Sequence, residues 1–325
     1  MLSIIECNNV KIWNDFLEKE KTNQMVTIAH NPCLGSILSK TFGYTHKNYF
    51  ITEGEDIVGV LPTVNIRGKI VSMPHFSYGG PILKKGLIDN FDLSTLVSDS
   101  NYEVRSFNKL SEYYTDEKLS CVLELQPAEE DMLMTIQQKL RQKVRKALRM
   151  NFKVRSGGIE LLEDYYYMFS SRMLKFGSPP LGKQFFKNLL EQYTNGDVQI
   201  TVIYDGDKPI SAGFSISYLG FNELCWSGTD DNYNKHNVNA LLFWEMIKTS
   251  IAKEHEYYSF GRSTKDSPQH FFKKLWSPIE LPIFYNLSQA PGRSLKDLEF
   301  LTKIWKYQPL KTSQILGHYV SKYVY

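Results

Sequence analysis

The chain has 325 residues, of which 42% are hydrophobic and 22% charged, and this apolar content is enough to offset the chain entropy lost on folding. A disordered chain is therefore excluded, and the length suggests about two domains. Lys plus Arg number 38 and Asp plus Glu number 35, and the net charge of +3 is too small to indicate a nucleic-acid-binding protein from the whole chain.

The first half of the sequence predicts a helix followed by an antiparallel sheet. Apolar residues recur at helical spacing over residues 10–20. The period then changes to that of strands, and turns at residues 53–56 and 67–68 predict a meander over about residues 47–73. Strands near residues 102–107 and 119–125 would complete an α+β layer.

The second half predicts the same plan after a long helix. Pro127 and the three acidic residues at positions 129–131 start this helix, and Leu140, Val144 and Ala147 belong to its apolar stripe. A second meander is predicted over about residues 198–228. Both meanders contain an acidic turn with a glycine, which agrees with two domains of one plan. Further helices are expected at residues 160–174, 184–193 and 239–253, and a strand at residues 257–261.

Common catalytic patterns are missing from the sequence. It has no Walker loop, no GxGxxG after a strand, no GxSxG and no HExxH. The seven histidines and four cysteines have no metal-ligand spacing, so no metal site is predicted. Neither a secretory signal nor a stretch of about 20 apolar residues is present, so we expect a cytoplasmic protein. Peripheral membrane contact stays open.

Four short strings carry the most specific information. They are Phe176-Gly177-Ser178-Pro179-Pro180, Val238-Asn239-Ala240-Leu241-Leu242-Phe243-Trp244-Glu245, Ser259-Phe260-Gly261-Arg262-Ser263 and Phe271-Phe272-Lys273-Lys274-Leu275-Trp276. In order and spacing they resemble the FemAB-like branch of the GNAT superfamily, in particular the group associated with exosortase and exopolysaccharide systems. The resemblance covers roughly residues 30–290 and is strongest from 137 to 286.

This resemblance implies an α+β fold of tandem GNAT-like domains. We expect the first domain over residues 1–135, the second, of the acetyltransferase type, over residues 136–292, and a C-terminal helical segment over residues 293–325 that packs back on the domains. The implied function is an N-acyl or aminoacyl transferase acting on a cell-envelope or surface-polysaccharide precursor. Two alternatives stay open: an acyl-CoA-dependent amino-sugar N-acetyltransferase, and a non-catalytic binding module for an anionic polymer.

By resemblance, Lys273 and Arg262 are the expected catalytic residues. The lysine of the similar string in Fem transferases is implicated in binding the acyl donor and the transition state. The alternative for Lys273 is a solvated lysine equivalent to its neighbour Lys274. Arg262 suits bidentate recognition of a phosphate or carboxylate, and its alternative is a structural ion pair with Asp266.

The expected substrate-binding residues are Tyr78, Arg145, Ser178, Trp226, Tyr233 and Asn239. A helix start near Asn239, after the strand that ends near Trp226, is where many GNAT enzymes bind the donor pyrophosphate. The usual Gly-containing loop is absent from the stretch that begins at Tyr233, which weakens the expectation of ordinary acetyl-CoA binding. Asn239 is otherwise a helix N-cap, Ser178 part of a rigid turn, and Tyr78 part of a buried turn.

The helix near residue 140 is strongly basic. It and the following residues carry eight cations and no acid between positions 132 and 155: Lys139, Arg141, Lys143, Arg145, Lys146, Arg149, Lys153 and Arg155. They either contact phosphates of an aminoacyl-tRNA, a nucleotide-linked sugar or a lipid carrier, or form a solvated face. No cofactor is required on this interpretation, since the donor itself is an acyl-CoA or an aminoacyl-tRNA.

Overall fold

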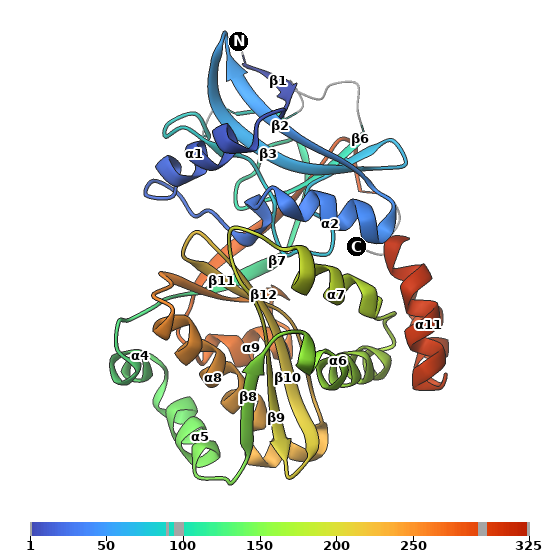
Figure 1. Ribbon diagram of the computed structural model, residues 1–325. Helices are drawn as coiled ribbons and strands as arrows, with labels where there is room; N and C mark the ends of the chain where they lie inside the picture. The colour runs from blue at the N-terminus through green and yellow to red at the C-terminus, as the bar shows by residue number, and fades with distance from the viewer. Residues whose placement is uncertain (1, 89–90, 94–100, 292–297, 324–325) are drawn as a thin grey trace. The chain divides into compact units, whose positions relative to one another are not determined.

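The computed structural model describes residues 2–88, 91–93, 101–291 and 298–323. The chain divides into two compact units (Figure 1). Unit 1 comprises Met1–Cys121, Arg262–His270 and Glu280–Gly292, and unit 2 comprises Val122–Gly261, Phe271–Ile279 and Arg293–Tyr325. Residues 262–270 and 280–292, expected in the second domain, thus group with unit 1. The predicted domain boundaries at 135/136 and 292/293 stay predictions.

Unit 1 combines short helices with a mainly antiparallel sheet. Its strands follow the order β1-β2-β3-β4-β6-β13, with β5 beside β3, and β4 and β6 run parallel. The helices are α1 (Val10–Glu20) and α2 (Cys33–Phe42). The strands are β1 (Leu2–Glu6), β2 (Thr45–Glu53), β3 (Asp56–Ile66), β4 (Lys69–Val71), β5 (Ile82–Leu83), β6 (Asn101–Ser106), most of β7 (Tyr113–Glu124) and nearly all of β13 (Ile279–Leu287).

Unit 2 has the strand order β12-β11-β10-β9-β8, with helices on both faces. Its strands are β8 (Lys153–Gly157), β9 (Val198–Asp205), β10 (Lys208–Tyr218), β11 (Phe221–Thr229) and most of β12 (Tyr257–Thr264). Its helices are α4 (Glu129–Thr135), α5 (Gln138–Leu148), α6 (Leu162–Phe176), α7 (Lys183–Gln192), α8 (Val238–Ala252), part of α9 (Pro268–Lys274), α10 (Leu298–Lys306) and α11 (Leu310–Val320). The α+β class is confirmed, and none of the described helices is long and apolar enough to cross a membrane.

Both predicted meanders are present, and they use the same turns. The first hairpin of each has a two-residue loop that starts with a glycine of positive φ, Gly54 (62°) in unit 1 and Gly206 (60°) in unit 2. The second hairpin of each has two consecutive positive-φ residues, Arg67-Gly68 and Leu219-Gly220. Such loops match the right-handed twist of the flanking strands, and glycine adopts them without strain.

Helices cover both faces of the unit 2 sheet because neighbouring residues of β10 point in opposite directions. Phe214 packs its ring 5.2 Å from that of Tyr165 on α6. The adjacent residue, Gly213, faces α8, and a Cβ atom there would lie 2.6 Å from the Sδ atom of Met246. Figure 1 shows α6 and α8 flanking these strands. The glycine therefore lets α8 approach the sheet closely.

The single long helix expected after Pro127 is two helices, and this part of the prediction is wrong. Helix α4 ends at Thr135, and Ile136 and Gln137 have extended ψ angles of 155° and 139°. The backbone N–H of Gln137 donates to the Leu275 carbonyl at 3.1 Å, and its side chain donates to the Lys274 carbonyl. These bonds replace the helical ones, while Leu140, Val144 and Ala147 are buried as predicted.

Candidate functional site

Strands β11 and β12 of unit 2 pair over a short length only. They run parallel, and their pairing covers three residue pairs that end at Glu223 and Ser259. Strand β11 continues to Thr229, paired along this part with β10. On its other side, residues 224–229 have backbone donors and acceptors that the described strand pairing does not use. An extended ligand can bind to such an edge as an added strand does.

A β-bulge lies where this pairing ends. Phe214 of β10 faces Trp226, but the next residue, Ser215, faces Leu224, so Cys225 is the extra residue of β11. A bulge bends the strand and redirects its side chains, and bulges are common beside active sites. The Cys225 thiol contacts the Glu223 carbonyl, and burial raises the pKa of the thiol well above its usual value. This cysteine is therefore not an activated nucleophile.

Helix α8 starts close to the end of β11. The residue before the helix, Asn237, has a left-handed conformation, and no side chain caps the helix start. Asn239 lies inside the first turn, so its interpretation as the N-cap residue is wrong. Its Oδ1 atom instead accepts a hydrogen bond of 3.3 Å from the Thr229 hydroxyl at the end of β11. Asn239 thus ties the helix start to the strand end.

Lys273 is buried beside the strand that carries the third string. Its side chain comes from α9, and its Nζ atom donates to the Gly261 carbonyl at 3.0 Å. Gly261 has a φ angle of 68°, which suits glycine. Lys273 is only 8% exposed, whereas Lys274 is exposed. The alternative of a solvated lysine equivalent to Lys274 is therefore wrong.

Five buried polar groups of unit 2 have no hydrogen-bond partner among the described residues, and three of them belong to tyrosine or tryptophan side chains. These three are the hydroxyls of Tyr165 and Tyr258 and the Nε1 atom of Trp276. Tyr258 lies on β12 next to the last parallel pair, and the pKa of each tyrosine is raised by burial and by proximity to Cys225. An unpaired buried hydroxyl costs about 1–3 kcal/mol. These groups could not be predicted from the sequence, because a tyrosine among apolar residues has the pattern of ordinary core packing.

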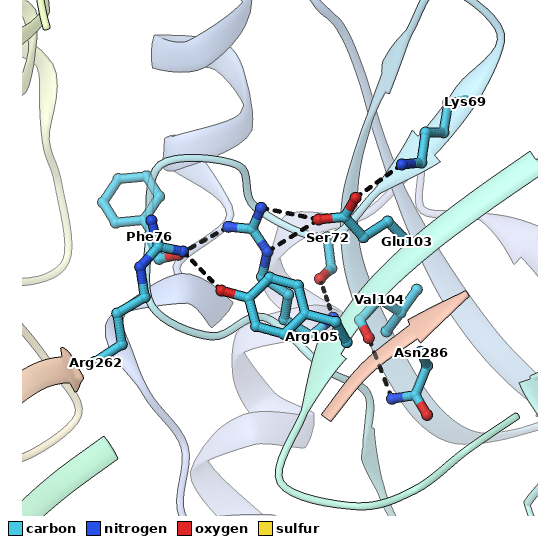
Figure 2. A network of polar contacts seen from close by, with 9 residues as sticks. Lys69, Ser72, Phe76, Glu103, Val104, Arg105, Arg262 and Asn286 are labelled. Atoms are coloured by element: carbon cyan, nitrogen blue, oxygen red, sulfur yellow. Dashed lines mark hydrogen bonds and ion pairs between the residues drawn. The ribbon is translucent and has the colours of Figure 1, made fainter. Parts of the chain in front are cut away.

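Unit 1 contains a buried ion network, shown in Figure 2. Arg105 on β6 is fully buried, and its guanidinium donates to the Glu103 carboxylate at 2.9 Å and to the Phe76 carbonyl at 3.2 Å. Lys69 approaches the other oxygen of Glu103 at 2.7 Å. Burial raises the pKa of Glu103, but the two cations outweigh it and lower the pKa overall. A lone arginine within the predicted strand at residues 102–107 was the available signal for this network.

Arg262 joins the same network. Its guanidinium donates to the Tyr285 hydroxyl at 3.0 Å, and its backbone N–H donates to the Ser77 hydroxyl. The Arg105 guanidinium lies 4.9 Å from the centre of the Tyr285 ring. Tyr285 therefore contacts both arginines through different parts of its side chain. The catalytic role of Arg262 stays a prediction, because the described contacts place it in a structural network of unit 1.

Tyr78 is buried in unit 1. Its ring stacks on Phe107 with centroids 3.8 Å apart and meets His30 edge-on. Burial raises the pKa of its hydroxyl. These contacts match the alternative of a buried turn that the sequence left open. They do not support a role of Tyr78 in binding an acceptor, which stays a prediction.

Three other predicted residues of unit 2 make separate sets of contacts. Ser178 closes the end of α6: its backbone N–H bonds to the Met173 carbonyl after the left-handed Gly177, which makes the stretch a rigid turn. Trp226 packs edge-on against Phe186 and belongs to an aromatic cluster. The Tyr233 hydroxyl donates to Asp205, which raises the pKa of that hydroxyl. Their roles in substrate binding stay predictions.

The basic residues of α5 are on the surface. Arg145, Lys146 and Arg149 are exposed, as is Lys139. None of the ion pairs among the described residues includes a cation from positions 139–155. Within the same described ranges, no three His, Cys, Asp or Glu side chains come together as metal ligands.

The comparisons with known proteins agree with this geometry. Residues 136–274 match the family model described as acetyltransferase (GNAT) domain. That part of the chain is therefore a GNAT-type acyltransferase domain, and the predicted membership of the GNAT superfamily is confirmed. No curated protein matches the sequence significantly.

Solved structures with little sequence identity share the fold over most of the chain. FemX superposes with a TM-score of 0.63 at 12% identity, over 88% of this chain and 98% of FemX. A tandem GNAT protein from the clavulanic acid biosynthesis pathway gives 0.52 at 8% identity, over 90% and 100%. L-PGS from Bacillus licheniformis gives 0.50 at 11% identity, over 92% and 98%. The prediction of tandem GNAT-like domains is thereby confirmed.

Proposed function

We propose that this protein is a FemAB-like N-acyl or aminoacyl transferase that acts on a cell-envelope or surface-polysaccharide precursor. Its donor binds in unit 2, along the side of β11 that faces away from β10, with the reacting carbonyl near Lys273. The similarity in fold to FemX and to L-PGS supports aminoacyl transfer as the chemistry. An aminoacyl-tRNA is then the donor, and a small or lipid-linked precursor is the acceptor.

The observation that carries this proposal is the position of Lys273. Burying an ammonium costs free energy that hydrogen bonds only partly offset, so a buried lysine at this place supports a use for its charge. Its Nζ atom is held by the Gly261 carbonyl, two residues after the point at which β11 and β12 stop pairing. Beyond this point the edge of β11 suits an extended donor. The bulge at Cys225 lies two residues after Glu223, the last residue of β11 that pairs with β12.

The chemistry requires few protein groups. The neutral amine of the acceptor attacks the donor carbonyl, a C–N bond forms, and the carbonyl oxygen becomes an oxyanion. The Lys273 ammonium is suited to stabilise that charge, because a fixed donor is worth more in a site that excludes water. The bond to the leaving oxygen or sulfur then breaks, and the amine loses its proton. No covalent enzyme intermediate is involved, so no nucleophilic triad is needed.

A thermal-shift screen with aminoacyl-tRNA, CoA esters and nucleotide-sugar precursors tests the proposal. A ligand at 100 times its dissociation constant stabilises the folded state by about 2.7 kcal/mol. We expect a shift with a donor in the wild type and a smaller shift in Lys273→Met. Lys274→Met is the matched control, since this neighbouring lysine is exposed, and its shift should equal that of the wild type. No shift with any donor in the screen would overturn the proposal.

One observation favours the acyl-CoA-dependent alternative. The start of α8 is free of a side-chain cap, and uncapped backbone N–H groups at a helix start suit a pyrophosphate. Under this alternative, CoA itself produces the thermal shift and tRNA does not. A shift with an anionic polymer alone, with no turnover of any donor, would instead favour the non-catalytic binding module.

The salt dependence of donor affinity separates the two donor classes. If α5 contacts a tRNA, affinity falls steeply with salt, with a slope near −0.7 for each phosphate neutralised on a single strand. The double variant Arg145→Glu/Lys146→Glu should then flatten the slope without unfolding the protein, since both side chains are exposed. Identical slopes for wild type and variant would remove α5 from the donor site. A CoA ester, with few phosphates, should show a shallow slope in both proteins.

A further inference from the structure

Helix α11 is packed with its small and polar residues inward. Ser313 and Gly317, four residues apart, are buried, as is Ser321 just beyond the helix end. A Cβ atom on Gly317 would lie 2.5 Å from the Pro180 carbonyl oxygen, and Gln314 donates to the Ser170 hydroxyl of α6. Figure 1 shows α11 beside α6 within unit 2. A surface helix normally buries its large apolar residues, and α11 does the reverse.

The large apolar side chains of this segment face outward instead. Ile315 is 63% exposed and Tyr319, one turn later, is 61% exposed, with Leu316 and Tyr323 on the same side. In the preceding helix and the residue after it, Ile304 and Tyr307 are also exposed, Tyr307 to 91%. These six residues are called the C-terminal apolar patch below.

The sequence around this patch is rich in lysine. From Phe300 to Tyr325 the sequence has four lysines and no Asp or Glu. Lys303, Lys306 and Lys311 are exposed, and none of them has an ion-pair partner among the described residues. Lys311 lies one helical turn before Ile315, so its ammonium flanks the apolar side chains. Long lysine stems can lie along an apolar surface while the ammonium stays in a polar layer.

We infer that the C-terminal apolar patch docks on the surface of an anionic lipid membrane. Helices that lie in a membrane interface bury Leu, Ile and aromatic side chains among the headgroups and place lysines against anionic lipids. Tyrosine is favoured at this depth, and each lysine near an anionic surface contributes about 1 kcal/mol. The patch combines these features, and the sequence from Phe300 to Tyr325 contributes no Asp or Glu to repel the lipid. The inference does not depend on the proposed transferase activity.

A second copy of the chain is a poorer occupant of the patch. Two-fold association places the same surface of each copy against the other, so it would bring Lys303, Lys306 and Lys311 of both copies together. These six like charges would lie at one interface with no described carboxylate to neutralise them. The lipid headgroup supplies the missing negative charge, and a second copy does not.

Vesicle co-sedimentation of the full chain tests this inference. We expect binding to vesicles of mixed phosphatidylglycerol and phosphatidylcholine, and much weaker binding to phosphatidylcholine alone. Lys306→Gln/Lys311→Gln should weaken binding roughly 25-fold, since each lysine accounts for about fivefold. Ile315→Ser/Tyr319→Ser should weaken it at least about tenfold through lost apolar insertion. Circular dichroism should show that both double variants stay folded, because all four side chains are exposed.

The matched control lies on α1. Ile12→Ser/Lys19→Gln removes an exposed isoleucine and an exposed lysine of another helix and should leave vesicle binding unchanged. Equal loss in this control, or no binding of the wild type to anionic vesicles, would overturn the inference. A wild-type dimer that Ile315→Ser/Tyr319→Ser abolishes, without any vesicle binding, would assign the patch to self-association instead. Loss of vesicle binding with unchanged donor thermal shifts would separate this docking from the transferase function.

Discussion

A buried polar network in unit 1 and two buried tyrosines in unit 2 differ in whether their polar groups are paired. In unit 1, Arg105 is fully buried and its guanidinium is paired with Glu103 and with the Phe76 carbonyl (Figure 2). In unit 2, the hydroxyls of Tyr165 and Tyr258 are buried with no partner among the described residues. A fully paired network holds a structure together, whereas an unpaired buried group is a cost that a ligand can remove. The difference gives the unit 1 network a structural role and makes the two tyrosine hydroxyls candidate ligand contacts.

Removing Arg105 should produce the largest loss of stability. Arg105→Ala deletes the buried partner of Glu103 and leaves the Phe76 carbonyl without its donor, and breaking a buried pair in this way costs about 3–5 kcal/mol. Urea unfolding measures the loss. Lys265→Ala, which breaks an exposed ion pair with Asp116, is the control and should cost less than about 1 kcal/mol. Equal costs for the two variants would remove the contrast between the units.

Lys273→Met should mainly affect turnover. A positive charge directed at a developing oxyanion contributes roughly 3 kcal/mol, so we expect about a hundredfold lower turnover with an accepted donor. Methionine is chosen because Lys273 is buried, and alanine would open a cavity and destabilise the fold. Steady-state kinetics of Lys273→Met and Lys274→Met check this. Equal turnover in the two variants would refute the assignment of Lys273.

His30 should make stability depend on pH. Burial lowers the pKa of His30 in unit 1 from 6.5 to about 4. The unfolded chain therefore binds a proton that the folded chain does not, and stability present above pH 6.5 is lost as the pH falls towards 4. The loss from this residue should reach about 2 kcal/mol at pH 5. Urea unfolding of wild type and His30→Gln at pH 7.5 and 5 measures it, and an equal pH dependence in both proteins would contradict it.

Tyr258→Phe should have the smallest effect of these variants, and it should stabilise the fold where Arg105→Ala destabilises it. The variant removes a buried hydroxyl that has no partner among the described residues, so the free energy of unfolding should rise by about 1 kcal/mol without ligand. If the donor supplies the missing acceptor, donor affinity should fall in the same variant. Thermal unfolding with and without donor gives both quantities. A destabilised Tyr258→Phe would mean that the hydroxyl is paired in solution.

Features encoded by neighbouring residues could be predicted from the sequence. The meanders follow from strand periodicity and from glycines at tight turns such as Gly54 and Gly206. The break between α4 and α5 could not be predicted, because it depends on the carbonyl of Leu275, far along the chain from Gln137. One local pattern indicates that Lys273 rather than Lys274 is buried. Lys273 lies three residues before the buried Trp276, so the two side chains share one face of a helical turn.

The partners in the Arg105 network could not be predicted for the same reason, although the lone arginine in a predicted strand indicated that it needs partners. Its members come from five separated stretches of sequence, which contain Lys69, Phe76, Glu103, Arg262 and Tyr285. No pattern within a short window joins them. By contrast, the four strings pointed to the superfamily because family motifs are local, and residues 136–274 match the family model.

The discontinuity of unit 1 has a consequence for how the protein is made on the ribosome. Strand β6 pairs with β13, and Asn286 of β13 bonds the Val104 carbonyl and accepts from the backbone N–H of Leu110. The sheet of unit 1 can therefore be completed only after residue 287 has been synthesised. Most of unit 2 has been synthesised by then. Until then β6 has an unpaired edge that can aggregate or recruit a chaperone. A gene fragment that stops after residue 135 would leave that edge exposed permanently.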